Sequence, residues 1–418
     1  MTEHVLIVGT GRDYPARLRR ALPGTQTSVM VQLEYVGKVR EPGENGRVIG
    51  VRGDAADQEW IDLAAAAHAH HPFTRILTVG ERNQDRCAAI GAALGLHTHS
   101  PETVTLVHDK EAMRARLLQA GVDATAHARV ANLGELRAFV TEHGMPCLVK
   151  PVSGSGSAGV AKVTDDSELA AAFEQAGGGY RGLSSTGVLV EKFHEGPQFS
   201  VEAFSETGEH QVLAVTRKYS DPVTFVELGH VSPAELPVEQ EEAIRSLVER
   251  VLDALGVEFG PTHTEIILGE AGPQVIETHV REGGDQIPAL TLDATGVDIA
   301  DCVVRQTLGE KVLPGIRATL AEPRAAGSSA IWFAAVGAAG VLDDVSGLDE
   351  ARALPGVTEV VMLAHPGSQV STLKSSESRV ASARAAGRTS DEAVGAAREA
   401  VACLEFRLRV RSLGGPTV

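Results

Sequence analysis

The feature that most constrains this sequence is a pair of extended segments, each with a glutamate among apolar and β-branched residues. The segments are THTEIIL (262–268) and QVIETHV (274–280), and a glycine- and proline-containing turn centred near Ala271 joins them. An antiparallel hairpin about this turn places Glu265 directly across from Glu277. Two carboxylates in that position destabilise a strand pair, so the fold must supply something that neutralises them.

A shared proton, an arginine or a divalent cation held by oxygen ligands would each neutralise the paired carboxylates. The same register places His263 across from His279. Because side chains alternate between faces, Glu277 and His279 share a face, and Arg281 shares it if the strand continues. The alternative is an exposed hairpin whose charges are solvated.

The overall composition excludes several classes of protein. The chain has 418 residues, of which 43% are hydrophobic and 22% charged, and this length predicts a globular protein of about two to four structural units. A net charge of −17 argues against a nucleic-acid partner but not against a nucleotide bound at a local basic site. The four scattered cysteines lack CxxC spacing and predict neither a zinc site nor a disulfide framework. No apolar run has the length of a signal peptide or a membrane span, so we expect a cytoplasmic protein without a membrane partner.

Strands and helices alternate through the first hundred residues, which predicts a parallel α/β domain. Gly9 and Gly11 follow the first strand, but Tyr14 stands where a dinucleotide fingerprint needs its third glycine. These glycines therefore indicate a tight turn and not a cofactor site. The HAHH run (68–71) contains potential metal ligands, but at a helix end before proline we expect a solvated terminus.

The loop SGSGSAG (153–159) is the first piece of a nucleotide site. Lys150 ends an apolar strand directly before this loop. Glycines let backbone N–H groups approach phosphate oxygens closely, and serines add hydroxyl donors. The lysine precedes the glycines, so this is not a Walker A loop, but it can still reach a phosphate as a point charge. The alternative is a glycine-rich hairpin with a surface lysine.

The strand VLVEKFHEG (188–196) is a second piece. It runs into Glu191 and continues to Phe193 and Gly196. A strand edge with one carboxylate offers an acceptor for the exocyclic amine of adenine and an N–H for its ring. The alternative is a solvated strand end.

The order of these pieces resembles that of the ATP-grasp superfamily of carboxylate–amine ligases. Lys110 comes first, then Lys150 with its glycine loop, then the Glu191 strand end, then the hairpin at 262–280. Within the superfamily, the run PTHTEIIL…VIETHVREGGDQIP looks most like the L-amino-acid ligases, which make dipeptides and peptide-like natural products. The same ligases share a lysine before a His-x-[Ser/Thr]-Pro stretch, here Lys218 and GHVSP. The resemblance covers at least roughly residues 1 to 310.

The resemblance implies an α/β protein with the ATP-grasp fold. Residues 1–104 would form the N-terminal parallel α/β domain, and residues 105–317 the ATP-grasp domain with a lid subdomain at about 125–190. Residues 318–418 would form a C-terminal α+β lobe. Within the lid, we expect the glycine- and serine-rich stretch 176–187 to be a flexible loop.

The resemblance also implies how ATP would bind. Lys110 and Lys150 would contact the phosphates, and Glu191 would take the adenine amine, with the backbone at Phe193 and His194 completing that contact. Gln198 stands where many members have a ribose-binding glutamate, but an amide can still bond a hydroxyl. The flexible loop over the phosphates would consist of Ser153, Gly154, Ser155, Gly156, Ser157 and Gly159.

The same resemblance assigns the metal and the catalytic residues. Glu265 and Glu277 would hold two Mg²⁺ ions, for which Mn²⁺ can substitute. Many members have asparagine where this chain has His279, and imidazole is a poor ligand for a hard cation, so either water completes the metal site or His279 acts on substrate. Arg281 would neutralise developing negative charge or bind a substrate carboxylate; the alternative is a purely structural ion pair with Glu265 or Glu277. His263 would line the substrate pocket.

The implied activity is an ATP-dependent ligase, with Lys218 among its catalytic residues. A carboxylate, expected to belong to an amino acid, would be activated as an acyl phosphate and joined to an amine, with release of ADP and phosphate. One alternative is a biotin-carboxylase-like or purine-pathway ATP-grasp ligase, and another is a nucleotide-binding protein without activity. A homodimer fits the resemblance, because dimers are common in these families.

Overall fold

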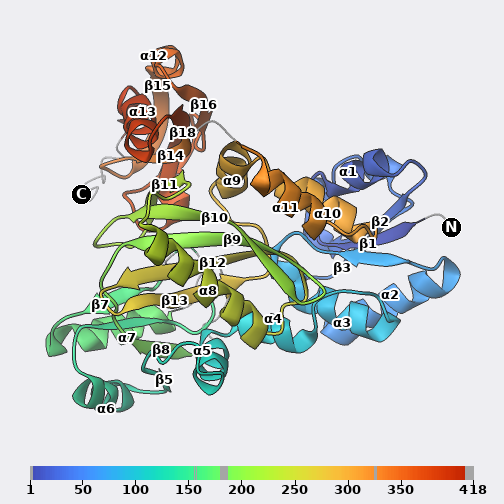
Figure 1. Cartoon of the computed structure of the whole chain (residues 1–418), viewed down its shortest axis with the longest axis horizontal. Coiled ribbons are helices and arrows are strands. Elements are labelled where there is room, and N and C mark those ends of the chain that lie inside the picture. Colours follow the sequence, from blue (N-terminus) through green and yellow to red (C-terminus); the bar gives the residue numbers. More distant parts are fainter. Residues whose placement is uncertain (1–2, 155, 157, 179–186, 324–326, 410–418) are drawn as a thin grey trace, which may run out of the picture.

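The computed structural model describes residues 3–154, 156, 158–178, 187–323 and 327–409. Within them the chain forms a parallel sheet near the N-terminus, an antiparallel lid sheet, a long central sheet and a small sheet near the C-terminus (Figure 1). Residues 179–186 of the expected flexible loop lie outside the described residues. None of the described helices is both long and apolar enough to cross a membrane.

The N-terminal sheet is parallel, as the strand–helix alternation predicts, and apolar side chains cover both of its faces. Val5 and Ile7 pack with α1 and with the distant helices α10 and α11, whereas Leu6 and Val8 pack on the opposite face, against α2 and α3. The strands follow the order β3 (Arg47–Val51), β2 (Gln26–Gln32), β1 (His4–Val8) and β4 (Arg75–Leu77). The helices are α1 (Tyr14–Ala21), α2 (Asp57–His70), α3 (Gln84–Leu94), α10 (Ile299–Thr307) and α11 (Leu313–Ala321).

The lid sheet is antiparallel, and its helices pack on it through one apolar cluster that includes Leu136, Val149 and Val190. Its strands follow the order β5 (His127–Val130), β8 (Val188–Lys192), β6 (Cys147–Pro151) and β7 (Ala161–Val163). Its helices are α6 (Leu133–His143) and α7 (Leu169–Gly177). The chain enters this part through α4 (Pro101–His108) and α5 (Lys110–Gln119).

The central sheet is antiparallel, and helix α8 (Val238–Ala254) buries its apolar face against it. From the lid side, its strands are β13 (Gly272–His279), β12 (Phe259–Gly269), β9 (Gln198–Glu206), β10 (Glu209–Ser220), β11 (Glu227–Ser232), β14 (Ser328–Ala335), β18 (Arg379–Gly387) and β16 (Val357–Met362). Because β11 pairs with β14, this sheet crosses the boundary we expect near residue 318. The domain boundaries therefore stay a proposal.

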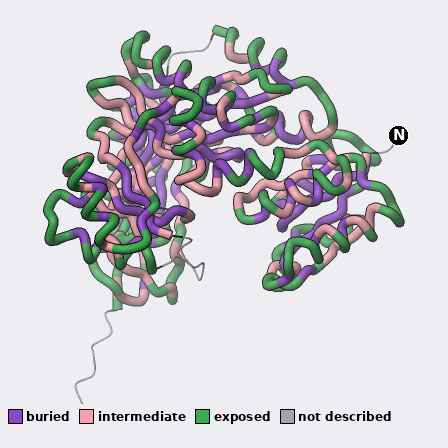
Figure 2. The backbone as a smooth tube through the Cα atoms, turned by 90° about the horizontal axis from the view of Figure 1, so that it is seen from below, coloured by how far each residue is buried: buried purple, intermediate pink, exposed green. Residues whose placement is uncertain are grey.

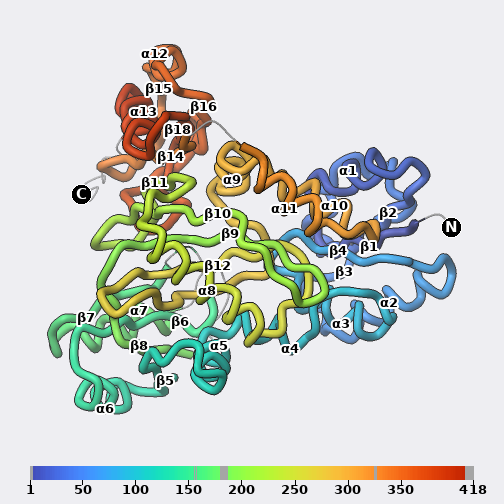
Figure 3. Tube along the Cα trace, viewed as in Figure 1, coloured from blue at the N-terminus to red at the C-terminus, as the bar shows by residue number. Residues whose placement is uncertain are grey.

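The C-terminal part adds a small sheet and two helices to the end of the central sheet. The strands are β17 (Gln369–Val370), β15 (Gly340–Ser346) and β19 (Glu405–Arg409), and the helices are α12 (Leu348–Ala353) and α13 (Ser390–Ala402). In Figure 2 the buried segments run through the interior of each part, with exposed segments outside them. The trace in Figure 3 shows α9 (Ile287–Thr295), α10 and α11 leading from the central sheet to the N-terminal domain.

Candidate functional site

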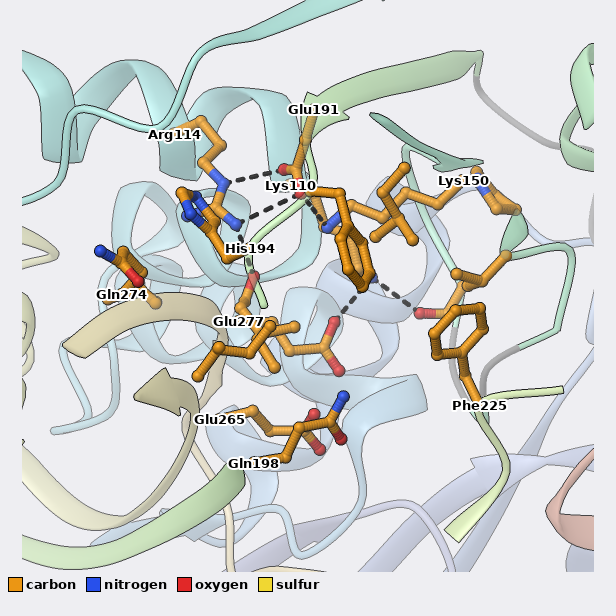
Figure 4. Close-up of a pocket in the computed structure, with 18 of the residues that line it drawn as sticks. Lys110, Arg114, Lys150, Glu191, His194, Gln198, Phe225, Glu265, Gln274 and Glu277 are labelled. Carbon is orange, nitrogen blue, oxygen red and sulfur yellow. Dashed lines mark hydrogen bonds and ion pairs between the residues drawn. The ribbon is translucent and has the colours of Figure 1, made fainter. Parts of the chain in front are cut away.

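Most of the predicted nucleotide-binding residues line one cavity between the lid sheet and the β12–β13 hairpin (Figure 4). Lys150 lies in β6 and Glu191 in β8, while Lys110 begins helix α5 directly after its N-cap, Asp109. The hairpin supplies the opposite wall of the cavity. The predicted residues that line this cavity are Lys110, Lys150, Gly154, Gly156, Glu191, Phe193, His194, Gln198, Glu265 and Glu277.

The glycine-rich loop faces this cavity and is tied to helix α5. The Lys110 ammonium donates a hydrogen bond to the Gly154 carbonyl at 2.9 Å. Gly156 has a φ of 68°, in the left-handed region that glycine adopts at little cost. The other predicted loop residues are Ser153 and Gly159, which are described, and Ser155 and Ser157, which lie outside the described residues.

A buried ion cluster joins the lid to helix α5. The Glu191 carboxylate lies 2.7 Å from the Lys150 ammonium and accepts two hydrogen bonds from the Arg114 guanidinium, at 2.8 and 3.3 Å. All three side chains are buried, with 4% or less of each exposed. Burial alone would raise the pKa of Glu191, but Arg114 and Lys150 outweigh it and lower that pKa to about 2. The Glu191 carboxylate is thus bound to two cations, which leaves the main chain as the natural partner for an adenine amine.

Phe193, His194 and Gln198, the remaining residues predicted for the nucleotide, also line this cavity. The Phe193 backbone N–H donates to the Pro146 carbonyl at 3.3 Å. The His194 ring bonds the Thr125 hydroxyl at 2.9 Å, and Gln198 accepts a hydrogen bond from Ser220 at 3.0 Å. These bonds fix the wall of the cavity, and the nucleotide contacts of these residues stay predictions.

The hairpin has the predicted register. Glu265 lies across from Glu277 and His263 across from His279, although a bulge follows Glu265. Each carboxylate is bound by its own lysine: Lys218 lies 2.5 Å from Glu265, and Lys110 lies 3.0 Å from Glu277. Lysine was not among the neutralising groups that the hairpin by itself suggested.

These lysines keep both carboxylates ionised. Burial acts to raise the pKa of Glu265, but Lys218 and His263 together outweigh it and lower the pKa to about 2. Burial acts on Glu277 in the same sense, and Lys110 and then His279 hold its pKa well below its ordinary value. Two charged carboxylates therefore face the cavity, each with about one sixth of its side chain exposed, at 16% and 18%.

The donor set at the hairpin fits magnesium. Mg²⁺ takes hard oxygen ligands and is commonly bound by one or two carboxylates, with water and substrate phosphates completing its shell. Glu265 and Glu277 provide such a pair. Among the described residues, no group of three or more His, Cys, Asp or Glu side chains is arranged to hold a metal by itself. His279 Nε2 bonds Glu277 at 3.1 Å, so the imidazole lies beside the paired carboxylates. The role of His279 towards metal or substrate stays a prediction.

A second, polar pocket adjoins the hairpin, and Gly156 of the glycine loop also lines it. It is lined by Lys218, His263, His279 and Arg281, all predicted catalytic or metal residues. The Arg281 guanidinium pairs at 2.8 Å with Glu81, in the loop after β4 of the N-terminal domain. The expected structural alternative was an ion pair between Arg281 and Glu265 or Glu277. The structure shows the N-terminal domain as the partner instead.

The C-terminal part also reaches this polar pocket. Arg379, at the start of β18, makes a bidentate ion pair with Asp285 at 2.6 and 2.7 Å, and His230 lies 3.2 Å from the same carboxylate. Burial acts to raise the pKa of Asp285, but His230 and Arg379 lower it below its ordinary value. Asp285 and Gln286 have φ values of 54° and 60°, which is strained backbone for residues other than glycine. The pocket is thus assembled from three parts of the chain.

A buried pair holds His263 in this pocket. The Glu202 carboxylate bonds His263 Nδ1 at 2.5 Å and accepts the Gly283 backbone N–H at 3.1 Å. Burial opposes a charge on His263, but Glu202 and Glu265 outweigh it and raise its pKa to about 9. Glu202 therefore orients the imidazole and fixes the glycine turn that follows β13.

Sequence reasoning missed several of these residues. Arg114 could have been found, since it lies four residues after Lys110 and so shares its helix face. Asp285 directly follows the glycine pair that the hairpin motif contains. Glu81 and Arg379 carry no local signal, because only the tertiary fold brings them to the site.

Comparison with known protein families agrees with this geometry. Residues 143–289 match the ATP-grasp domain family, and residues 332–409 match the L-amino acid ligase C-terminal domain 2 family. The first match spans β6, the glycine loop, β8 and the hairpin. The second covers most of the C-terminal part, including Arg379.

Two curated proteins are similar in sequence to part of this chain. An uncharacterized protein, y4rH, of Sinorhizobium fredii is 33% identical over 271 residues, which is 65% of this chain and 55% of that protein. An alanine–anticapsin ligase of Bacillus subtilis is 25% identical over 232 residues, which is 50% of this chain and 49% of that protein. The chain thus spans about half the length of these curated relatives.

A solved structure matches nearly the whole chain. The L-amino acid ligase from Bacillus licheniformis superposes with a TM-score of 0.81, covering 98% of this chain and 99% of that one, at 22% sequence identity. This match establishes the α/β ATP-grasp fold that the order of the sequence pieces predicts.

Proposed function

Because the chain belongs to the ATP-grasp superfamily and carries the C-terminal domain of L-amino acid ligases, we propose that it is an ATP-dependent carboxylate–amine ligase. In this proposal it joins the carboxylate of an amino acid to an amine and forms an amide or peptide bond, with release of ADP and phosphate. The observation that carries the proposal is the pair of ionised carboxylates, Glu265 and Glu277, between a lysine-lined cavity and a polar pocket.

In this proposal the cavity beside the lid binds the nucleotide, and the polar pocket binds the substrates. Lys110 and Lys150 line the first cavity beside the glycine loop, where they would contact ATP phosphates. Glu265 and Glu277 border both cavities. Magnesium held by these carboxylates would offset the negative charge of the phosphates during transfer. Arg281 lies in the polar pocket, where its planar fork suits a carboxylate or a phosphate.

The reaction needs two steps. In the first, a carboxylate oxygen of the substrate attacks the terminal phosphorus of ATP, the bond to the ADP oxygen breaks, and an acyl phosphate forms. In the second, the amine nitrogen attacks the acyl carbon, loses a proton, and inorganic phosphate leaves. Both steps build negative charge on phosphate oxygens, which Lys110, Lys150 and Arg281 are placed to stabilise. The glycine loop is suited to closing over the phosphates and excluding water.

The C-terminal domain favours amino-acid ligation over the alternatives. The match over residues 332–409 is to the L-amino acid ligase C-terminal domain 2 family. This domain supplies Ser376 to the lining of the polar pocket, and its Arg379 pairs with Asp285 of the same lining. A biotin-carboxylase-like enzyme would instead require bicarbonate. A nucleotide-binding protein without activity would bind ATP and release no ADP.

A screen of ADP and phosphate release over pairs of amino acids, with mass detection of products, tests the proposal. Wild-type protein should turn over ATP only with magnesium and a suitable pair, and the product mass should equal that of the two substrates minus water. Glu277→Gln should be inactive, while Glu270→Gln, at the exposed turn of the same hairpin, should keep wild-type activity. Bicarbonate-dependent turnover, or ATP binding without ADP release over the whole panel, would overturn it.

A further inference from the structure

A single arginine behind the wall of the polar pocket bonds three of the residues that line it. Glu227 in β11, Asp285 in the segment after β13 and Ser376 in the turn before β18 all belong to the lining. Arg379 begins β18 and is not among the described residues of that lining. Its side chain nevertheless bonds all three, so one residue outside the pocket can set the pocket's shape.

The N–H groups of the Arg379 guanidinium are directed at different elements. Nη1 and Nη2 donate to the two carboxylate oxygens of Asp285 at 2.7 and 2.6 Å, the bidentate geometry that a planar guanidinium favours. Nε donates to the Ser376 carbonyl at 2.9 Å, and Nη1 also donates to the Glu227 carbonyl at 3.4 Å. A lysine could not make this set of bonds, because its single ammonium has no planar fork.

The surroundings of Arg379 fix its side chain. Only 7% of the side chain is exposed, and the guanidinium carbon lies over the Phe333 ring of β14, 3.9 Å from the ring centroid. A desolvated cation in this position is attracted by the negative face of the ring. The pair between Arg379 and Asp285 therefore differs from the exposed ion pairs of the chain, which contribute little to stability.

The segment that Arg379 holds has an unfavourable backbone conformation. Asp285 and Gln286 have φ values of 54° and 60°, and Gln286 is the N-cap of α9. Two successive residues other than glycine keep such a conformation only where the surrounding structure holds them there. The Asp285 carboxylate lies 3.2 Å from His230 of β11, so both of its side-chain partners come from the central sheet. Of these two, Arg379 makes the bidentate contact.

We propose that Arg379 is a positioning residue for the amino-acid substrates: through it, the C-terminal domain holds Asp285 and the strained segment in the wall of the polar pocket. Arg379 acts through Asp285, Glu227 and Ser376, and does not touch a substrate itself. The inference rests on the proposed ligase function and deepens it. It gives the C-terminal domain a task in the reaction, which is to complete the substrate pocket.

The cavity between the lid and the hairpin provides the contrast. Asp285 and Ser376 line the polar pocket and not that cavity, whereas Glu227 lines both. Arg379 reaches Glu227 only at the main-chain carbonyl, through the longest of its hydrogen bonds. Loss of Arg379 should therefore impair the use of amino acids and leave the affinity for ATP close to that of wild type. A general loss of folding would lower both.

Substitutions of Arg379 and of a second arginine on the same strand form a matched set. Arg384 pairs with Asp293 of α9 at 3.3 Å, and neither residue lines the polar pocket, so Arg384→Gln breaks a contact of β18 away from the pocket. Arg379→Gln removes both the charge and the fork. Arg379→Lys keeps the charge and removes the fork, which guards against misfolding.

The measurements are kcat and KM for the proteinogenic L-amino acids in an ADP-release assay, and the calorimetric affinity for the non-hydrolysable ATP analogue AMP-PNP with magnesium. Arg379→Gln should lower kcat/KM for the amino acids by about tenfold or more, since a displacement of about 1 Å can cost about 100-fold. Arg379→Lys should lie between this variant and wild type. Arg384→Gln should match wild type, and all variants should bind AMP-PNP as wild type does. Equal amino-acid kinetics in Arg379→Gln and Arg384→Gln would overturn the proposal, as would a parallel loss of AMP-PNP affinity in Arg379→Gln and Arg379→Lys.

A double-mutant cycle tests whether Arg379 acts through Asp285. The cycle compares Arg379→Gln, Asp285→Asn and the double variant. Residues in one ion-pair network have non-additive effects, so the double variant should lose little more activity than the worse single variant. A loss equal to the product of the two single losses would show that Arg379 acts by another route.

Hydrogen–deuterium exchange gives a readout that needs no turnover. The Gly283 amide donates to Glu202 at 3.1 Å and the Ile287 amide to the Gly284 carbonyl at 2.9 Å, so both amides are protected in the folded protein. Exchange over residues 283–287 should become faster in Arg379→Gln and stay unchanged in Arg384→Gln. Unchanged exchange in both variants would contradict the hold of Arg379 on this segment.

The two proposals fail in distinguishable ways. If no amino-acid pair supports ADP release but residues 283–287 exchange faster in Arg379→Gln alone, the ligase proposal fails and the hold of Arg379 on the pocket stands. If ADP release occurs and Arg379→Gln has the same amino-acid kinetics as Arg384→Gln, the positioning role fails and the ligase proposal stands.

Discussion

Replacing Glu191 with glutamine removes the buried carboxylate that joins Lys150 in the lid to Arg114 on helix α5. The pKa of Glu191 lies at about 2 instead of its ordinary 4.5, which corresponds to about 3 kcal/mol of folding free energy at neutral pH, at about 1.4 kcal/mol for each unit of pKa. Removal of one partner from a buried ion pair costs about 3–5 kcal/mol, because it leaves an uncompensated charge. The two estimates overlap at about 3 kcal/mol, which is the smallest loss of folding free energy expected for Glu191→Gln.

Thermal or urea unfolding at pH 7 measures this loss, with hydrogen exchange of the β6 and β8 amides to locate it. Glu195→Gln is the matched control, because Glu195 is four residues away, 77% of its side chain is exposed, and it lies 3.5 Å from Lys162. Exposed pairs contribute about 0–1 kcal/mol, so the control should unfold close to wild type. Equal midpoints for wild type and Glu191→Gln would refute the reasoning.

The pH dependence gives a second check with a definite sign. The folded-state pKa of Glu191 is depressed, so its contribution is complete above the unfolded pKa of about 4.5 and is lost as the pH falls towards 2. The stability gap between wild type and Glu191→Gln should therefore be constant near neutrality and close between about pH 4.5 and 2. A gap that does not change over this range would contradict the assignment.

Glu277→Gln should abolish magnesium-dependent ADP release in a folded protein, and near-full activity would remove Glu277 from the metal site. Without magnesium this variant should also melt earlier than wild type, because Glu277 is paired with Lys110, whereas repulsion between facing carboxylates alone would predict a later melt. Lys110→Ala and Lys150→Ala should each raise the KM for ATP by about tenfold or more, and unchanged nucleotide affinity in both would rule out the phosphate contacts. Arg281→Lys should raise the KM for one amino acid and spare that for ATP. A rise for ATP alone would assign Arg281 to the nucleotide, and a loss of thermal stability alone would make its pair with Glu81 structural.

The hairpin register could be predicted from sequence because it depends on local rules. A short turn and the twofold period of a strand suffice to place Glu265 opposite Glu277. The parallel N-terminal sheet followed in the same way from alternating strands and helices. The choice of neutralising group could not be predicted, since Lys218 and Lys110 come from other elements and meet the hairpin only after folding.

The role of Glu191 shows a different limit. A glutamate at a strand end predicts either a solvated charge or a ligand contact. Neither interpretation predicts that the carboxylate is buried in an ion pair with a cation of the protein. In the structure the carboxylate faces Arg114 and Lys150 and is almost fully buried. Charge complementarity between a helix face and a strand is a tertiary property, so a strand motif by itself does not reveal it.

Local sequence motifs contain most of the residues that line the cavity between the lid and the hairpin, but they do not contain the contacts that shape the polar pocket. The residues predicted to contact the phosphates lie in continuous motifs of the lid, α5 and the hairpin, whereas the polar pocket depends on pairs 94 and 200 residues apart, Arg379 with Asp285 and Arg281 with Glu81. The proposed ATP site can therefore be recognised from sequence order, while we expect substrate selection to depend on how three parts of the chain pack. Changes at Glu81 or Arg379 should consequently alter which amino acids are used and leave the affinity for ATP intact, because neither residue lines the nucleotide cavity.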